Sequence, residues 1–298
     1  MKKVLWMMLS LMLVFNLVGC GDATSNDKEA KEETKEETKE ETKEEVQEVK
    51  FEEVVVVDNE ECKVVITEIE PDHLFGYTLH TTLENKSKEK TYMYTLESAS
   101  INGVQSETIF ASEVAPGKKA NEDIHFMDET LKEAIKDYSD IYLTFKVYDS
   151  NDWSADPVAY ESVHVYPYGK EKATTYVREP QDSDQVLIDN EYASVVVTGY
   201  EQNDIWGYQI HLYVTNKTDN TAMFSADNLS INGYMLDVLA AESVIPHTSA
   251  FTTITCFNNE LEENKITDVE DIEFTLRVYN YDDVFAGDYV KEVITLKP

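Results

Sequence analysis

The stretches FGYTLHTTLEN (residues 75–85) and WGYQIHLYVTN (residues 206–216) carry one pattern twice. In both, every second side chain is mainly apolar, and the positions between are polar, aromatic or glycine. A period of two over about ten residues is typical of a β-strand with one buried face. We therefore expect two equivalent half-buried strands, with these inward faces: Phe75, Tyr77, Leu79, Thr81 and Leu83, and Trp206, Tyr208, Ile210, Leu212 and Val214.

These strands belong to a larger repeat, because residues 54–166 recur at residues 185–296. Val57-Asp58-Asn59-Glu60 returns 131 positions later as Ile188-Asp189-Asn190-Glu191, and Ile101-Asn102-Gly103 returns 130 positions later. A single one-residue gap accounts for the difference. The chain thus contains a tandem of one domain type, and about 110 residues per copy can hold a hydrophobic core.

A second long strand is predicted in each copy by the same alternation. Shorter segments at 54–57, 62–69, 91–96, 106–114, 119–127 and 158–166 bring the first copy to about eight strands. Asn102-Gly103 and Asn232-Gly233 suit tight hairpins, because both residue types tolerate positive φ. The inward faces of the second long strand are Ile141, Leu143, Phe145 and Val147 in the first copy and Ile272, Phe274, Leu276 and Val278 in the second.

One short helix is expected in each copy. Asp128 can cap a helix through Leu131, Ala134 and Ile135, and Asn259 can cap one from Leu261 to Ile266. Each helix lies between two strands, which favours a crossover between sheets. Seven to nine antiparallel strands with one buried face and a crossover helix predict an all-β fold of two tandem immunoglobulin-like β-sandwiches.

The N-terminus has the three-part layout of a secretory signal, with Lys2 and Lys3, an almost wholly apolar run over residues 4–18, and small residues before Cys20. Leu17-Val18-Gly19-Cys20 resembles the lipobox of bacterial lipoproteins. That resemblance implies cleavage of a signal peptide at residues 1–19 and a diacylglyceryl thioether on Cys20. Two acyl chains hold a protein stably on a bilayer. The alternative is an uncleaved anchor helix or a buried cysteine.

Residues 20–50 form the lipidated cysteine and a linker in which Lys-Glu-Glu-Thr is repeated. The linker contains no aromatic residue, so it cannot bury enough surface to compensate for ordering the chain. We expect a solvated spacer there, with a specific binding tail as the alternative. The two domains then occupy residues 51–168 and 185–298, and residues 169–184 join them.

The other two cysteines, Cys62 and Cys256, lie in different copies, so neither copy has a pair of its own. Two buried free thiols are the favoured interpretation, and an interdomain disulfide is the alternative. The fold of each domain would then depend on its hydrophobic core.

The net charge of −34 is concentrated in the repeats, because residues 1–20 contribute +2 and residues 21–50 contribute −6, which leaves −30 on residues 51–298. Such a surface repels the phosphates of nucleic acids and anionic lipid headgroups. We therefore exclude nucleic acid as a partner.

Acidic loops follow the second long strand in both copies and raise the question of calcium. Oxygen-rich loops suit this hard cation. Neither loop continues as an EF-hand, because no glycine stands at the sixth position. A solvated turn is the favoured interpretation, so no metal or other cofactor is expected, and the weak calcium candidates are Asp149, Asp152, Asp282 and Asp283.

No catalytic motif is present: the chain lacks Gly-x-Ser-x-Gly, His-Glu-x-x-His, a Walker loop, Cys-x-x-Cys and Gly-x-Gly-x-x-Gly. The six histidines are scattered. Enzyme activity is not expected.

The outward faces of the long strands are the candidate binding face. If the two long strands of each copy were neighbours, a cation, an imidazole and a tyrosine would gather on one sheet face. Tyr and Arg are common at binding surfaces. The alternative is ordinary pairing of these side chains with nearby acids. The candidate residues are His80, Lys146 and Tyr148 in the first copy and His211, Arg277 and Tyr279 in the second.

A lipobox, a Lys/Glu-rich spacer and tandem sandwiches together resemble the largely uncharacterised immunoglobulin-like domains of Gram-positive surface lipoproteins. This resemblance implies a non-catalytic protein anchored by its lipid to the outer face of the cell membrane. We expect the domains to bind another protein at the cell surface. The alternatives are a glycan-binding module, for which Trp153 in a loop would be a carrier, and a passive spacer or accessory subunit of an envelope complex.

Overall fold

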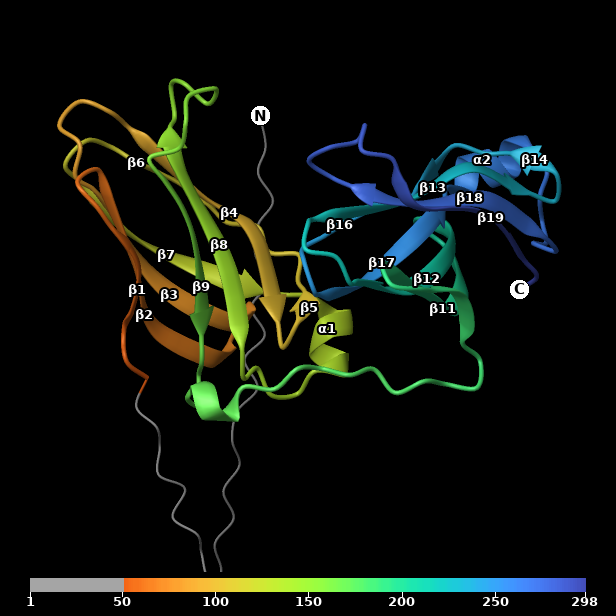
Figure 1. Cartoon of the computed structure of the whole chain (residues 1–298), viewed down its shortest axis with the longest axis horizontal. Coiled ribbons are helices and arrows are strands. Elements are labelled where there is room, and N and C mark those ends of the chain that lie inside the picture. Colours follow the sequence, from red (N-terminus) through yellow and green to blue (C-terminus); the bar gives the residue numbers. More distant parts are fainter. Residues whose placement is uncertain (1–50) are drawn as a thin grey trace, which may run out of the picture. The chain divides into compact units, whose positions relative to one another are not determined.

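The computed structural model describes residues 51–298, which form two β-sandwiches (Figure 1). The predicted all-β class of two tandem immunoglobulin-like sandwiches is confirmed. The signal peptide at 1–19, the lipidation of Cys20 and the linker at 20–50 lie outside the described residues. Within the described residues, no helix has the length and apolar character needed to cross a bilayer.

The first sandwich contains nine strands and one helix. They are β1 (Val54–Asp58), β2 (Cys62–His73), β3 (Gly76–Asn85), β4 (Tyr92–Ile101), β5 (Val104–Gln105), β6 (Ala111–Val114), β7 (Lys119–Phe126), α1 (Glu129–Ala134), β8 (Ile141–Asp149) and β9 (Ala159–Val165). One sheet has the order β1-β2-β3-β7, and the other contains β5-β4-β8-β9 with β6 paired to β4. Immunoglobulin domains pair strands A, B and E in one sheet and C, F and G in the other, and β2-β3-β7 and β4-β8-β9 reproduce these two sets.

The second sandwich repeats this plan. It is preceded by a short 3₁₀-helix, Lys170–Lys172. One sheet has β10 (Gln185–Asp189), β11 (Ala193–Asn203), β12 (Gly207–Asn216) and β17 (Ser249–Cys256), with β15 (Val238–Leu239) paired to β17. The other has β14 (Tyr234–Met235), β13 (Ala222–Ile231), β18 (Ile272–Asn280) and β19 (Asp288–Leu296), with β16 (Ala241–Val244) paired to β13. Helix α2 (Asn258–Glu263) connects β17 to β18.

The alternation of β3 and β12 fills the core of each sandwich, as predicted, except at its first position. Leu79 and Leu83 in β3 and Ile210 and Val214 in β12 are completely buried. Phe75 and Trp206 are instead 55% and 56% exposed, so their predicted inward orientation is wrong. Both strands begin one residue later, at a glycine that closes a hairpin with the preceding strand.

The two Asn-Gly turns are confirmed as tight hairpins. Asn102 and Gly103 have φ values of 50° and 79°, and Asn232 and Gly233 have 50° and 80°. Positive φ at both central positions is the geometry that matches the right-handed twist of the flanking strands. These hairpins add β5 and β14, two short strands that the sequence pattern did not predict.

The two helices cross between the sheets, as predicted, but only one has the predicted cap. The Asp128 carboxylate accepts a hydrogen bond from Leu131 N at 3.0 Å and starts α1. Helix α2 begins at Asn258 and has no side-chain cap, so the prediction for Asn259 is wrong. The preceding Asn258 side chain instead donates to the carbonyls of Asn203 and Asp204 in the β11–β12 hairpin.

Cys62 and Cys256 are buried free thiols, which confirms the favoured interpretation. Burial raises the pKa of the Cys62 thiol to about 11 and that of Cys256 to about 12. A thiol in this environment stays protonated at neutral pH and reacts slowly, so both cysteines act as small core residues.

Residues 51–298 belong to one compact unit, and the segment between the sandwiches is held by specific contacts. Tyr176 N donates to Asn102 O at 2.7 Å, and Arg178 forms a bidentate ion pair with Asp184 at 2.7 and 2.8 Å. Strand β5 of the first sandwich also pairs in parallel with β17 of the second, at Val104 and Ser249. Backbone and side-chain contacts therefore fix the segment predicted as a linker.

Candidate functional site

The candidate binding face predicted from the sequence is divided between two sheets in each sandwich. His80 lies on β3, which pairs with β2 and β7, whereas Lys146 and Tyr148 lie on β8, which pairs with β4 and β9. His211 on β12 is separated from Arg277 and Tyr279 on β18 in the same way. The predicted adjacency is therefore wrong, because strands B and F face each other across the core of an immunoglobulin-like sandwich.

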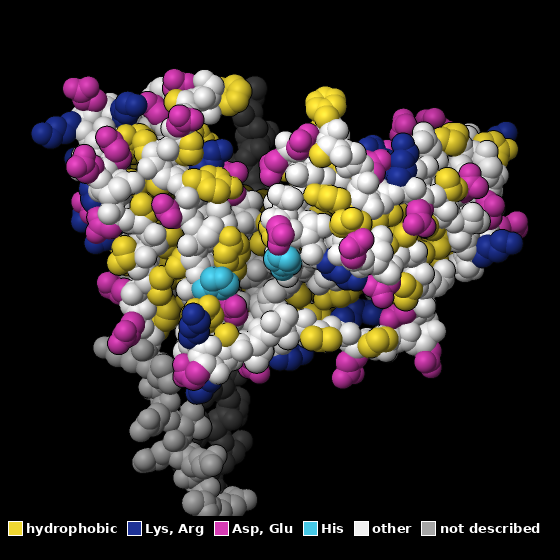
Figure 2. All heavy atoms as spheres, viewed as in Figure 1, with side chains coloured by type: hydrophobic (Ala, Val, Ile, Leu, Met, Phe, Trp, Pro, Cys, Tyr) yellow, Lys and Arg dark blue, Asp and Glu magenta, His cyan; other side chains and the backbone are white. Residues whose placement is uncertain are grey.

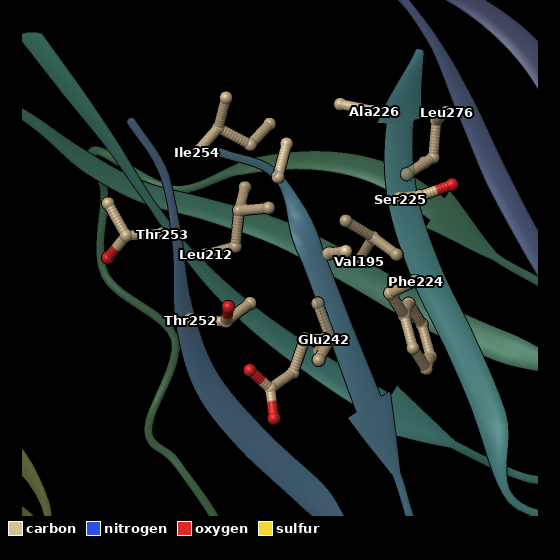
Figure 3. Close-up of a pocket in the computed structure, with 13 residues that line it drawn as sticks. Val195, Leu212, Phe224, Ser225, Ala226, Glu242, Thr252, Thr253, Ile254 and Leu276 are labelled. Atoms are coloured by element: carbon tan, nitrogen blue, oxygen red, sulfur yellow. The ribbon is translucent and has the colours of Figure 1, made fainter. Parts of the chain in front are cut away.

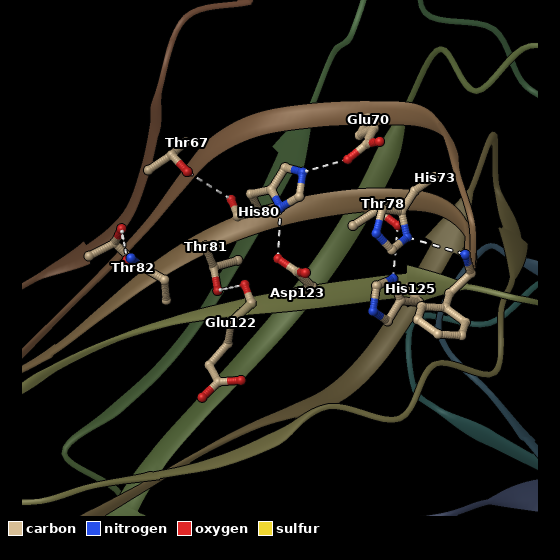
Figure 4. Close-up of polar contacts among 12 residues, drawn as sticks. Thr67, Glu70, His73, Thr78, His80, Thr81, Thr82, Glu122, Asp123 and His125 are labelled. Atoms are coloured by element: carbon tan, nitrogen blue, oxygen red, sulfur yellow. Dashed lines mark hydrogen bonds and ion pairs between the residues drawn. The ribbon is translucent and has the colours of Figure 1, made fainter.

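His80 is held between two carboxylates (Figure 4). Its Nδ1 lies 2.7 Å from Asp123 and its Nε2 lies 3.2 Å from Glu70. The hydrogen bond to Asp123, supported by the one to Glu70, holds the pKa of His80 above its usual value. In the second sandwich His211 keeps one such partner, Glu201, at 3.2 Å. Both histidines thus have acidic neighbours on their own sheet.

Two further histidines join His80 on this sheet of the first sandwich (Figure 4). The His73 and His125 rings stack with centroids 5.1 Å apart, and His73 meets His80 edge to face at 6.4 Å. Thr78 Oγ1 lies 2.8 Å from His125 Nδ1. Among the described residues, no group of three or more His, Cys, Asp or Glu side chains is arranged to hold a metal ion.

The cations of the candidate face are paired within their own sheets. Lys146 Nζ lies 3.8 Å from Glu97 and 5.5 Å from the Tyr148 ring. Arg277 contacts both Asp227 and Asp288, at 3.1 and 2.8 Å, and lies 4.8 Å from the Tyr279 ring. These two carboxylates raise the pKa of Arg277 further above its usual value. Cross-strand pairing, the alternative drawn from the sequence, therefore describes these contacts.

The weak calcium candidates lie in turns that are closed by local hydrogen bonds. Asp149 accepts from Asn151 N at 3.0 Å, and Asp152 accepts from Ser154 Oγ at 2.8 Å. Asp283 accepts from Phe285 N at 3.2 Å, and the Asp282 backbone N donates to the side chain of Asn280. Both loops are therefore hydrogen-bonded turns, and the absence of bound calcium stays a prediction.

Two exposed pairs of apolar side chains stand at equivalent hairpins of the two repeats. Leu74 and Phe75, between β2 and β3, are 87% and 55% exposed. Ile205 and Trp206, between β11 and β12, are 80% and 56% exposed. We call these two pairs the hairpin tips. The sequence contained the signal for them, an aliphatic–aromatic pair at the same place in both copies, but alternation alone had placed the aromatic member in the core.

The loops at the other end of the long strands also expose an aromatic residue in each repeat. Trp153, between β8 and β9, is 81% exposed, and Phe285, between β18 and β19, is 95% exposed. Val284 is the residue that aligns with Trp153, so a comparison by fixed offset misses Phe285 by one position. Figure 2 shows acidic side chains over the visible surface, with hydrophobic side chains standing among them.

A small cavity of about 20 Å³ opens beside Glu242 at the edge of the second sandwich (Figure 3). Val195, Leu212 and Phe224 are among its apolar walls. Gln105 Nε2 donates to Glu242 Oε1 at 2.9 Å. Burial, strengthened by the negative charge of Glu107, raises the pKa of Glu242 to about 7. The cavity is large enough for one water molecule and too small for a ligand.

Glu242→Gln is expected to remove a pH dependence of folding stability. Because the folded pKa of Glu242 is about 7 and its ordinary value is 4.5, the wild-type carboxyl should lose its stabilising contribution as pH rises between these values. The variant should match the wild type near pH 4 and exceed its free energy of unfolding at pH 8 by about 3 kcal/mol. Urea denaturation across this pH range measures the difference. Glu113→Gln, an exposed change on the equivalent strand β6, is the control, and equal curves for all three proteins would contradict the expectation.

The strands, sheets and turns define an all-β protein of two immunoglobulin-like sandwiches. No family model and no curated protein matches the chain. Among solved structures, the YadV chaperone is similar at 13% identity over 74% of this chain and 92% of its own, with a TM-score of 0.23. Red sea bream transglutaminase is similar at 12% identity over 81% of this chain and 31% of its own, with a TM-score of 0.22. The CsuC–CsuE chaperone–tip adhesion subunit complex of Acinetobacter baumannii is similar at 11% identity over 73% and 90%, with a TM-score of 0.22.

Proposed function

We propose that this is a lipid-anchored protein of the outer face of the cell membrane, whose two sandwich domains form a non-catalytic protein-binding module. The lipobox-like sequence ending at Cys20 supports the anchor. The observation that carries the binding role is the duplication of the hairpin tips, which expose an aliphatic and an aromatic side chain at the same place in both repeats. Exposed apolar groups of this size on a highly charged protein are typical of interaction sites.

The hairpin tips are held in a fixed conformation. Asn203 Oδ1 accepts hydrogen bonds from Ile205 N and Trp206 N, both at 3.0 Å. In the first repeat His73 Nδ1 accepts from Phe75 N at 3.2 Å. A preordered loop loses little conformational entropy on binding, and Trp is among the residues that contribute most at protein interfaces. The tips therefore suit recognition of a folded or extended polypeptide.

The charge beside the tips favours a protein over a lipid surface. Glu70 and Asp72 precede the first tip in the chain, and Glu201 and Asp204 precede the second. Carboxylates repel the anionic headgroups that an inserting tip would have to approach. A polypeptide with cationic groups around an apolar patch would match both the apolar side chains of the tips and the carboxylates beside them.

The proposal is tested by photo-cross-linking the full chain on intact cells. A photoreactive residue in place of Phe75 or Ile205 should capture the same polypeptide, and capture from position 205 should fall at least about tenfold when Trp206 is changed to Ala. Cys20→Ala should also reduce capture, because the protein would leave the membrane. The adducts are identified by mass spectrometry.

Phe285 is the matched control position, because it is 95% exposed and lies in the second repeat, in the β18–β19 loop at the opposite end of the sandwich from the tip. The same adducts from position 285 as from position 205 would rule out the tips as the binding element. Absence of any adduct from both tips would instead favour a passive spacer.

A further inference from the structure

The outer face of the β4-β8-β9 sheet carries rows of hydroxyl groups that cross three strands. Ser98 is paired with Thr144, which is paired with Ser162. In the next row Ser100 is paired with Tyr142, which is paired with His164. Side chains paired in this way point to the same face of a sheet. We call this surface the hydroxyl face.

The hydroxyl face forms the floor of a hollow rather than a flat surface. Ser100 and Thr144 point away from the core, yet they are only 3% and 4% exposed. Residues 245–248 also line the hollow, whose volume is about 420 Å³. Hollows of 300 to about 1,000 Å³ are the usual size of small-ligand sites.

The hydroxyl groups on this floor are held by one another. Tyr142 Oη donates to Ser162 Oγ at 2.9 Å, and Thr144 Oγ1 donates to Tyr142 Oη at 3.2 Å. Thr144 Oγ1 and Ser162 Oγ are 3.0 Å apart. Each hydroxyl oxygen has two lone pairs, so these groups can still accept hydrogen bonds from a ligand. The floor thus offers ordered, uncharged acceptors and donors.

Aromatic rings stand beside this floor. Tyr160, which is 57% exposed, lines the hollow together with Tyr142 and His164. The ring centroids of Tyr142 and His164 are 5.0 Å apart, and His164 stacks on Tyr166 at 5.6 Å. Aromatic faces offer a flat apolar surface beside the polar groups that fix a ligand's orientation.

The hollow is almost free of charge, although residues 51–298 are strongly acidic. The carboxylate that lines it, Asp140, is bound to His164 Nδ1 at 2.6 Å, and His247 is bound to Asp219 at 2.9 Å. The second sandwich has different residues at the equivalent positions of these rows. Glu273 stands at the position of Tyr142, Val293 at that of Ser162, and Lys291 at that of Tyr160. The uncharged hydroxyl and aromatic character therefore belongs to the first repeat and does not follow from the fold.

We propose that the hydroxyl face of the first sandwich is a binding site for a neutral saccharide unit. Sugar hydroxyls both donate and accept hydrogen bonds, as the Ser, Thr and Tyr hydroxyls of the floor do, and the apolar face of a pyranose ring stacks on an aromatic side chain such as Tyr160. An anionic sugar would meet Asp140 and the surrounding negative potential. This site is separate from the hairpin tips, and it does not depend on the protein-binding proposal.

The test is saturation-transfer NMR of the full chain with neutral disaccharides: maltose, cellobiose, lactose and N,N′-diacetylchitobiose. At least one should bind saturably with a Kd on the order of 1 mM. Tyr160→Ala and Ser162→Val should each weaken that binding at least about tenfold, because the first removes the stacking surface and the second a ligand-facing hydroxyl. Val is the residue that the second repeat has at the position of Ser162, so the fold should tolerate it.

Trp153→Ala is the matched control, because it removes an exposed aromatic side chain from the loop between β8 and β9, two of the strands that form the hydroxyl face. Retained binding in this variant, together with loss in the other two, supports the site. Loss with Trp153→Ala and retention with Tyr160→Ala would place the saccharide on the loop and overturn the proposal. No saturable binding of any of the four sugars up to about 20 times the expected Kd would overturn it as well.

Discussion

Gly207→Ala is expected to destabilise the second sandwich strongly, while the first keeps its stability. Gly207 has a φ of +109°, which side chains other than glycine rarely adopt. A Cβ at this position would stand 2.1 Å from Cys256 O and 2.7 Å from Asn258 N, both of which are backbone atoms. Backbone strain and overpacking together should cost about 3 to 5 kcal/mol, a large fraction of the stability of a single domain.

The change is measured by amide hydrogen exchange, which reports on each sandwich separately. Protection of β12 and β17 should fall in Gly207→Ala, while β3 and β7 keep theirs. Gly76→Ala should have the reverse effect, because its Cβ would stand 2.4 Å from Phe126 O. Gly199→Ala is the control, since no atom lies within 4 Å of its added Cβ. Equal protection in Gly207→Ala and Gly199→Ala would contradict the predicted clash.

Asn216→Asp is expected to have the second large effect. The Asn216 side chain is completely buried, and its Nδ2 donates to Asn220 O and Val244 O, both at 2.8 Å. Its Oδ1 accepts from Thr218 N at 2.9 Å. An aspartate would place a buried carboxylate oxygen against carbonyl oxygens and remove both donors, which should cost about 3 to 5 kcal/mol at pH 7.

This loss should depend on pH in a defined direction. Burial of one carboxylate oxygen against two carbonyl oxygens raises the pKa of the carboxyl group, so the variant should be least destabilised near pH 4, where the acid is protonated, and increasingly destabilised as pH rises. Urea denaturation at pH 4 and pH 7 measures the change. Asn220→Asp makes the same change of charge at an exposed position of the same turn and should cost little. A loss for Asn216→Asp no larger than for Asn220→Asp would refute the role of the buried amide.

Asn216 and its equivalent in the first repeat, Asn85, make long-range hydrogen bonds that the local sequence does not predict. Both begin an Asn-x-Ser/Thr sequence, and Asn, Ser and Thr side chains are typical of turns. Asn85 is 1% exposed and donates to Lys90 O and Val114 O, both at 2.8 Å. The turns are present, and each buried amide also ties its turn to the strand that follows. No local pattern reveals this, because the accepting carbonyl of Val114 lies 29 positions away.

The candidate site was less predictable than the fold. His80 and Lys146 were correctly placed on the outward faces of their strands, but the sequence did not reveal that these strands belong to opposite sheets. The exposure of Phe75 and Trp206 was also hidden, since a residue at the end of an alternating run cannot be distinguished from the first residue of the strand. The hydroxyl face was missed because its rows combine three segments that are distant in the chain.

The sequence by itself determined the repeat, the strands with their buried faces, the Asn-Gly hairpins and the cap on α1. These features depend on side-chain periodicity and on local backbone preferences, both of which act over a few residues. The tertiary structure alone decided which strands are neighbours, which side chains gather on one face and which apolar residues stay in solvent. These features depend on contacts between residues far apart in the chain. Alternation indicates that one face of a strand is buried, but it does not indicate which element packs against that face.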